Sequence, residues 1–222
     1  MNRDYAVAAH SPEAVLATNK LIRNTYILLS MTLIFSAVMA GISMALRIPL
    51  GASMFCSLGA LGLLWFVLPK MANSAAGLWV TFAVTGLLGF GLGPILTHYL
   101  AMPNGGQTVM TAMGGTGVIF LGLSGYALTT RKDFSFMAGY LFTGILVAFL
   151  AGIGALIFSL PALSLAVSAV FILLMAGFIL YQTSEMVNGG ETNYIMATVG
   201  LYIGIYNLFT SLLHLLGAFG NE

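Results

Sequence analysis

The sequence predicts an all-α polytopic membrane protein in which seven helices cross the bilayer. Only 6% of its 222 residues are charged and 59% are hydrophobic, so the chain cannot cover itself with a solvated surface as a soluble domain does. The hydrophobic residues fall into seven runs of about 20 residues, the length that spans a bilayer core as a helix. The 27 glycines are typical of membrane helices that pack closely through small residues.

Each of the seven runs ends where polar residues, glycine or proline interrupt it. The expected spans are Tyr26–Leu46, Ala52–Leu68, Leu78–Leu100, Val109–Leu128, Phe136–Leu160, Leu163–Tyr181 and Tyr194–Gly217. The interruptions include Arg47-Ile48-Pro49, Pro69-Lys70, Thr129 to Asp133 and Pro161, and Pro94 predicts a kink within the third span. The loops are too short to fold alone, so residues 25–218 are expected to form a single membrane domain.

The two ends of the chain and the basic residues predict the orientation. Residues 1–24 are too polar to span and are expected to form a cytoplasmic tail with a surface helix that starts near Pro12, and residues 219–222 a short outer tail. With the amino terminus inside, six of the seven basic residues lie in the cytoplasm, namely Arg3, Lys20, Arg23, Lys70, Arg131 and Lys132. The positive-inside rule favours this orientation, with Glu185–Thr192 as a cytoplasmic loop. Because the seventh span has no flanking cation, a re-entrant helix is the alternative there.

The seventh span carries a stripe of small and polar residues. At 100° per residue, one side of the helix carries Asn193, Gly200, Gly204, Asn207, Ser211 and His214, and the opposite side Tyr202, Tyr206, Phe209 and Leu213. Small and polar side chains in a membrane helix face protein rather than lipid. This pattern predicts a hub helix packed among other spans, with its small and polar stripe toward protein.

Small residues at regular spacing predict close packing in three other spans. These sets are Gly86, Gly89 and Gly93 in the third span, Gly114 and Gly117 in the fourth, and Gly144, Ala148 and Gly152 in the fifth. We expect each set to be a seam against a neighbouring helix.

Few residues are suited to chemistry, and the sequence predicts no catalytic, cofactor or metal site. No span centre carries a charged residue, whereas a pump or coupled transporter usually has buried carboxylates, so the sequence argues against active transport. Gly122-Leu123-Ser124-Gly125 matches the GxSG of rhomboid proteases and His214 follows in a later helix, but a match this short arises easily by chance, so packing glycines are favoured. His98 and His214 without a carboxylate or thiolate make a poor metal site. The single Cys56 excludes an internal disulfide, and a net charge of +1 gives no reason to expect nucleic-acid binding.

Several motifs resemble a known family. Gly89 to Pro94, Ser164 to Phe171, Gly190 to Ile195 and Leu201 to Phe209 resemble the BAX inhibitor family of seven-helix membrane proteins, and the resemblance runs from about Asn19 to the end. Leu128 to Phe136 and Gly189 to Ile195 are most similar to its bacterial YccA-type subgroup. The resemblance implies a last helix surrounded by the other six, and a protein of the bacterial inner membrane that binds and modulates the membrane-anchored, ATP-dependent protease FtsH.

Other members of the family are pH-sensitive calcium leaks closed by a pair of aspartates. The resemblance places these aspartates at Gln182 and Gly204, so the carboxylate pair that shares a proton is absent in its family form. Glu185, three residues after Gln182, is a possible substitute, although a solvated loop carboxylate is the favoured interpretation. The candidate polar pathway or latch therefore comprises Gln182, Glu185, Gly204, Asn207, Ser211 and His214.

The sequence thus predicts a regulator that binds FtsH without catalysis of its own. Its exposed amino-terminal tail is a segment that a cytoplasmic protease can engage, because loosely held termini are where such enzymes start. The alternative is a calcium or proton leak channel along the polar stripe, although hard cations prefer carboxylates and carbonyls to amides and hydroxyls. Intramembrane proteolysis at Ser124 is a third and weaker hypothesis.

Overall fold

The structure is a computed structural model that describes residues 12–220. In that part of the chain seven helical segments are long and apolar enough to cross a membrane, and no strand is formed, so the predicted fold class is confirmed. The elements are α2 (Pro12–Ala45), α3 (Gly51–Gly62) continued by the π-helical turn η1 (Leu63–Val67) and α4 (Leu68–Met71), α5 (Ala75–Leu100), α6 (Gly105–Thr130), the 3₁₀ turn η2 (Ser135–Met137) leading into α7 (Ala138–Ile157), α8 (Pro161–Asn188) and α9 (Tyr194–Phe219).

Two of the helices extend well beyond their predicted bounds. Helix α2 is a single 34-residue helix from Pro12, so the described part of the predicted tail runs directly into the first span. Helix α8 continues past Tyr181 to Asn188, and the predicted loop Glu185–Thr192 is therefore wrong at its start. Polar residues of this last stretch bond to the loop after α6, so their polarity did not mark the end of the helix.

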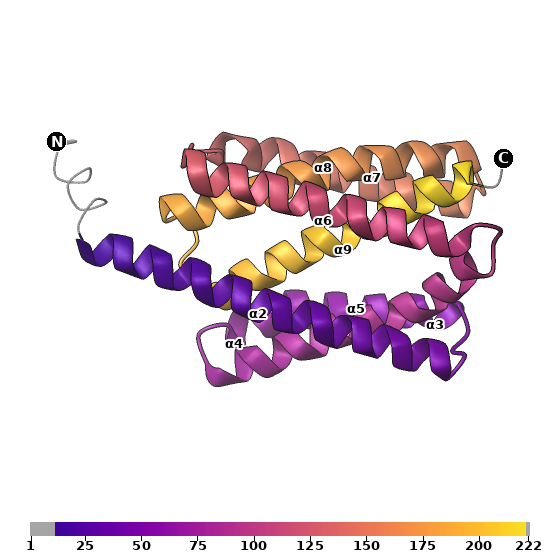
Figure 1. The fold of residues 1–222 in the computed structure, drawn as a ribbon, viewed down its shortest axis with the longest axis horizontal. Helices are drawn as coiled ribbons and strands as arrows, with labels where there is room; N and C mark the ends of the chain where they lie inside the picture. The colour runs from indigo at the N-terminus through magenta and orange to yellow at the C-terminus, as the bar shows by residue number, and fades with distance from the viewer. Residues whose placement is uncertain (1–11, 221–222) are drawn as a thin grey trace.

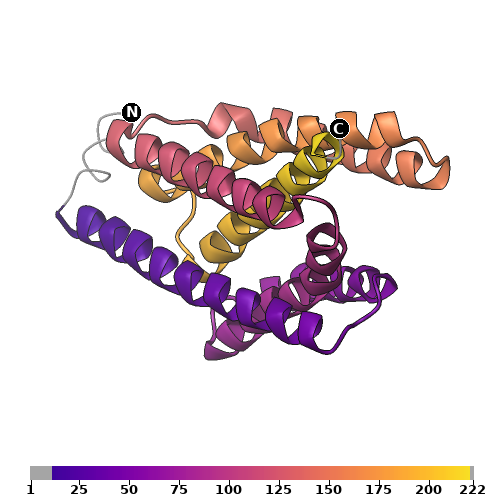
Figure 2. The same ribbon diagram turned by 45° about the vertical axis from the view of Figure 1, so that its right-hand side comes forward.

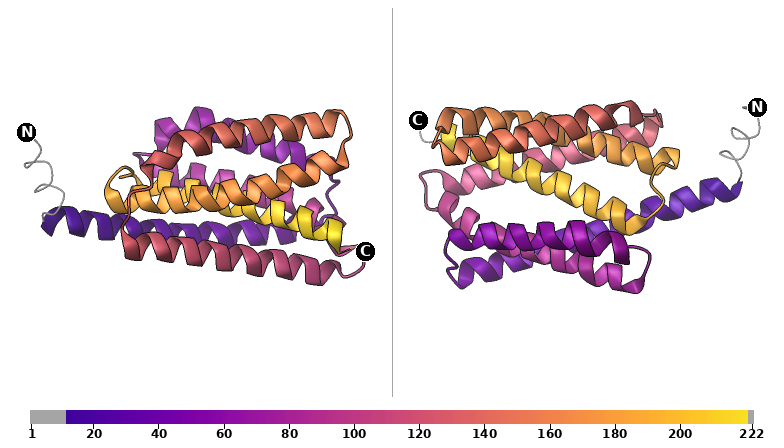
Figure 3. Two further views of the ribbon diagram at one scale, coloured as in Figure 1. Left: turned by 90° about the horizontal axis from the view of Figure 1, so that it is seen from above. Right: turned by 180° about the vertical axis from the view of Figure 1, so that it is seen from behind.

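The helices form two layers with α9 between them. In Figure 1, α2, α3, α4 and α5 make the lower layer and α6, α7 and α8 the upper one, while α9 crosses obliquely from the lower layer to the upper. Figure 2 and the right-hand view of Figure 3 show the same diagonal course. Helix α9 packs against α2, α5, α6 and α8, and in the described chain its backbone makes no close approach to α3 or α7. Helix α9 was expected to be surrounded by the other six spans, but only these four pack against it in the described chain.

Both sides of α9 face protein. No residue from Tyr194 to Ala218 is exposed, whereas α7 exposes many large apolar side chains. The small and polar stripe lies toward protein, as predicted. The bulky side is buried as well, because Tyr202 and Leu213 are among the most buried side chains. Helix α9 crosses between the two layers, so both of its sides pack against protein.

Glycine spacing predicted two of the three seams. On α5, a Cβ at Gly89 would meet the backbone of Ser36, and one at Gly93 would lie 2.6 Å from the Cβ of Ser43. These contacts bring α5 against α2. On α7, Gly144 packs against Leu174 and Gly152 against Val167 of α8.

The third predicted seam, on α6, is wrong. Around Gly114 and Gly117 a Cβ would meet no atom within 4 Å. The side of α6 that packs in the bundle instead carries Val109, Ala112, Thr116, Ser124 and Ala127. Spacing shows that two residues share a side of a helix, but it does not show which side the neighbouring helices occupy.

Tyr202 joins three helices through its hydroxyl. The side chain is 1% exposed, its hydroxyl lies 2.6 Å from Ser36 Oγ of α2, and it donates to the Thr85 carbonyl of α5 at 3.2 Å. Sequence reasoning placed Tyr202 opposite the polar stripe but identified no partner for its hydroxyl, which needs one when buried.

Tyr202→Phe is expected to destabilise the protein by about 1–3 kcal/mol, because it leaves the Ser36 hydroxyl and the Thr85 carbonyl without this partner. The measurement is thermal unfolding of the purified protein in detergent. Tyr140→Phe is the control, since Tyr140 is 74% exposed. Equal unfolding midpoints for the two variants would show that the hydroxyl of Tyr202 is not a structural link.

Candidate functional site

The seam between α8 and α9 contains most of the predicted latch residues. The two helices are antiparallel and joined by residues 189–193. A Cβ on Gly200 would lie 2.9 Å from the amide carbon of Gln182, whereas Gly204 packs against Phe178 and Ile179. Gln182 therefore faces Gly200, one turn before the glycine that the family resemblance pairs with it. The exact register of two packed helices depends on side-chain volumes along the whole seam.

Glu185 lies outside this seam. Its carboxylate lies against Gly190 in the turn that follows α8. The side chain of Gln182 makes no hydrogen bond within the described chain. The structure therefore shows a partly buried, unbonded amide against a glycine, with the nearest carboxylate of α8 directed toward the loop.

The remaining candidate residues lie in the other half of the seam. The Asn207 amide donates to the Ile203 carbonyl of its own helix at 2.9 Å. His214 Nδ1 lies 2.8 Å from Ser168 Oγ and so links α9 to α8. Ser211 lies one turn before His214 and is partly buried. The six candidates thus lie along the length of α8 and α9, with Gln182 and His214 in opposite halves, and do not converge on one site.

The other sequence motifs are separated in the same way. Ser124 Oγ lies 3.4 Å from Thr183 Oγ1, in the half of the bundle opposite His214, so these two residues form no catalytic pair. His98 is exposed and its ring stands edge-on to Tyr99 at 5.5 Å. Over residues 12–220 no group of three or more His, Cys, Asp or Glu residues is close enough to hold a metal ion.

Asn193 ties the start of α9 to the loop before α5. Its side-chain oxygen accepts hydrogen bonds from the amides of Ile195 and Met196, at 2.9 and 3.2 Å, which caps α9. Its amide nitrogen donates to the Ala72 carbonyl at 3.0 Å and to Asn73 Oδ1 at 2.7 Å. One side chain therefore fixes both the start of α9 and its position beside α5.

The end of α8 is tied to the loop after α6 by similar bonds. Ser184 Oγ donates to the Lys132 carbonyl and accepts from the Phe134 amide, both at 3.0 Å. Asn188 Nδ2 donates to the same carbonyl at 3.2 Å. Residues 131–134 are thus bonded to the end of α8, and residues 72–73 to the start of α9. We call residues 72–74, 131–134 and 184–193 the loop cluster. Sequence reasoning missed it, although Asn193 directly before an apolar run is a recognisable helix cap.

Asp133 is the carboxylate of this loop cluster with a perturbed pKa. The Ser135 amide donates to Asp133 Oδ1 at 2.8 Å, and this bond holds the pKa of the carboxyl below its ordinary value. The pKa of Asp133 is lower in the folded protein than in the unfolded chain. The bond therefore stabilises the turn at pH values above the ordinary pKa of aspartate. That contribution is lost as the pH falls through the folded value.

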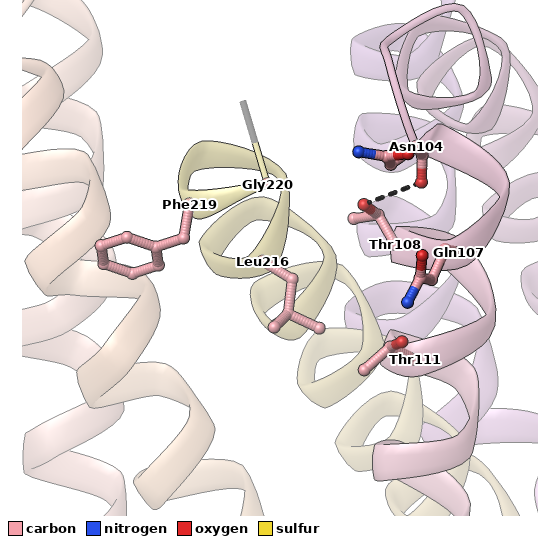
Figure 4. Close-up of a pocket in the computed structure, with 7 residues that line it drawn as sticks. All are labelled: Asn104, Gln107, Thr108, Thr111, Leu216, Phe219 and Gly220. Carbon is pink, nitrogen blue, oxygen red and sulfur yellow. Dashed lines mark hydrogen bonds between the residues drawn. The ribbon is translucent and has the colours of Figure 1, made fainter. Parts of the chain in front are cut away.

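A pocket of about 330 Å³ lies at the opposite end of the bundle. Figure 4 shows Asn104, Gln107, Thr108 and Thr111 of α6 and its preceding loop on one wall. Leu216 of α9 and Gly220, directly after this helix, lie on the other wall, and the Phe219 ring is directed away from the α6 wall. The polar lining is uncharged. None of the predicted site residues lines this pocket.

Comparison with known proteins gives one family and several bacterial relatives. Residues 18–221 match the family model described as "Inhibitor of apoptosis-promoting Bax1". The chain is 47% identical over 210 residues, 95% of each chain, to the Modulator of FtsH protease YccA of Escherichia coli. It is 47% identical over 222 residues, the whole of both chains, to an uncharacterized membrane protein of Vibrio cholerae, and 48% identical over 202 residues, 91% of this chain and 90% of the relative, to an uncharacterized protein of Pseudomonas aeruginosa.

Proposed function

The chain belongs to the BAX inhibitor family, and we propose that it is a bacterial inner-membrane regulator that binds the protease FtsH and modulates it without catalysis of its own. The observation that carries the proposal is the 47% identity, over 95% of both chains, to a protein named as a modulator of FtsH protease. The match to the family model, over residues 18–221, likewise extends through nearly all of the chain.

Regulation by binding agrees with the side chains of the described helices. Ser124 and Thr183 contact each other without a histidine, and His214 contacts Ser168 in the other half of the bundle. A hydrolytic mechanism needs a nucleophile, a base within hydrogen-bond reach and a group that orients the base. This arrangement supports a protein that acts through its surfaces.

We further propose that the loop cluster faces the cytoplasm, where a membrane-anchored protease carries out proteolysis. The end of the bundle that holds the loop cluster also holds Lys20, Arg23, Lys70, Arg131 and Lys132, whereas Arg47 lies at the other end. This distribution supports a cytoplasmic amino terminus and a periplasmic carboxyl terminus. Residues 1–11, the part of the predicted tail nearest the terminus, lie outside the described residues.

Co-purification tests the proposed partnership. The full chain, tagged at its carboxyl terminus and isolated from crosslinked membranes in mild detergent, is expected to bring FtsH with it. A tagged multi-pass membrane protein of an unrelated family, expressed at the same level, is the control and should not. Repeated isolation without FtsH, from cells in which the protease is present, would refute the proposal.

A calcium or proton leak remains the alternative prediction from sequence. The described α8–α9 seam offers an amide, hydroxyls and an imidazole, with Glu185 directed toward the loop. None of the relatives named above is described as a channel. The regulator is therefore the function that we propose.

A further inference from the structure

Two neighbouring residues of α2, Thr25 and Tyr26, have buried hydroxyl oxygens without a hydrogen-bond partner in the described chain. Thr25 is 0% exposed. A buried threonine of a helix commonly donates to a carbonyl one turn earlier, as Thr32 of the same helix donates to Leu29 at 2.9 Å, but Thr25 makes no such bond. An unbonded hydroxyl in an apolar interior is unfavourable, so these two groups point to a further hydrogen-bonding partner.

The surroundings of the two hydroxyls form a closed ring of contacts across four helices. On one side, Thr198 of α9 donates to the Thr25 carbonyl at 3.3 Å. On the other side, the Tyr26 ring lies 6.1 Å from the ring of Phe120 in α6. The ring closes through α8, where Thr183 contacts Ser124 of α6 and the neighbouring Gln182 packs against Gly200 of α9.

The backbones of α2 and α6 stay apart at this level. The helices α2 and α9, α9 and α8, and α8 and α6 pack closely, but in the described chain no Cα atom of α2 lies within 8 Å of one in α6. Tyr26 and Phe120 therefore bridge a wider interval than the other contacts of the ring. A wide interval lined by unbonded polar groups is the setting in which small molecules are held inside proteins.

The unbonded groups that belong to this ring are all neutral. They are the hydroxyls of Thr25 and Tyr26 and the amide of Gln182. The nearest charged residues along these segments are Arg23, which is exposed, and Glu185, which lies against Gly190. Hydroxyls and an amide both donate and accept, as water does, whereas hard cations select carboxylates and carbonyls. We propose that Thr25, Tyr26 and Gln182 bind water at an internal site between α2, α6, α8 and α9, independently of the role proposed toward FtsH.

X-ray hydroxyl-radical footprinting of the full chain in nanodiscs tests this site, because radicals formed from bound water oxidise the side chains beside it. Tyr26 is expected to be oxidised in the wild-type protein. In the double variant Thr25→Val, Gln182→Leu, which removes two of the three polar groups, the oxidation rate of Tyr26 is expected to fall at least about threefold.

Thr32→Val is the matched control, because it makes the same substitution on the same helix at a hydroxyl already bonded within α2. It should leave the oxidation of Tyr26 unchanged. The oxidation of exposed Tyr140, measured in every sample, reports that each sample is equally irradiated, and the protection of buried Tyr202 reports that each variant is folded. A wild-type Tyr26 that resists oxidation as buried Tyr202 does, or an unchanged rate in the double variant, would overturn the proposal.

Discussion

Gly89→Ala is expected to separate α2 from α5 and to lower the free energy of unfolding by about 1–3 kcal/mol or more. The added methyl group would lie 2.7 Å from Ser36 Cα and closer still to the Ser36 carbonyl and hydroxyl oxygens, so backbone must move to admit it. The displacement would also strain the contact between Ser36 and Tyr202 on α9. Thermal unfolding in detergent, followed by circular dichroism, measures the effect.

Gly117→Ala is the matched control for that experiment. Gly117 lies in a helix of the same protein, and an added Cβ there would meet nothing within 4 Å. This variant should unfold at the wild-type temperature or slightly above it, because alanine favours the helix more than glycine does. If both variants unfolded alike, close contact between α2 and α5 would not be what requires glycine at position 89.

The second large effect is expected at Asn193. Asn193→Ala removes the cap of α9 and both bonds to the loop before α5, and we expect it to cost about 2–3 kcal/mol. Asn193→Asp keeps an oxygen that caps the helix but loses the donor to Ala72 and Asn73. It should therefore be destabilised by less than the alanine variant.

Unfolding midpoints of the two Asn193 variants separate capping from the contact between helices. Asn188→Ala, which removes bonds from a different side chain of the same loop cluster, serves as the comparison. Equal losses for the alanine and aspartate variants would mean that the bonds to residues 72 and 73 carry the whole effect. A wild-type midpoint for Asn193→Ala would contradict the structural role of this residue.

The length of apolar runs was enough to predict the seven spans, because a helix must bury its backbone polar groups wherever it crosses a bilayer. Small residues at helical spacing predicted the seams of α5 and α7. The same signal failed at Gly114 and Gly117, since spacing carries no information about where the neighbouring helix lies.

Contacts between distant segments were beyond sequence reasoning. The extension of α8 depends on Ser184 and Asn188 bonding to Lys132 and Phe134, about fifty residues earlier in the chain. The pairing of Gln182 with Gly200 depends on the register of two helices, which the family motifs do not specify. The partners of the Tyr202 hydroxyl, Ser36 and Thr85, lie more than a hundred residues earlier in the chain, so the sequence alone did not reveal them.

The most direct measurement of the proposed function is the rate at which purified FtsH degrades a membrane substrate in proteoliposomes that also contain this protein. Degradation is expected to slow as the protein is added, because the protein binds FtsH and modulates it. Ser124→Ala and His214→Asn should slow degradation as the wild-type chain does, because no chemistry of this protein is involved. A degradation rate that stays constant at every ratio would contradict the account.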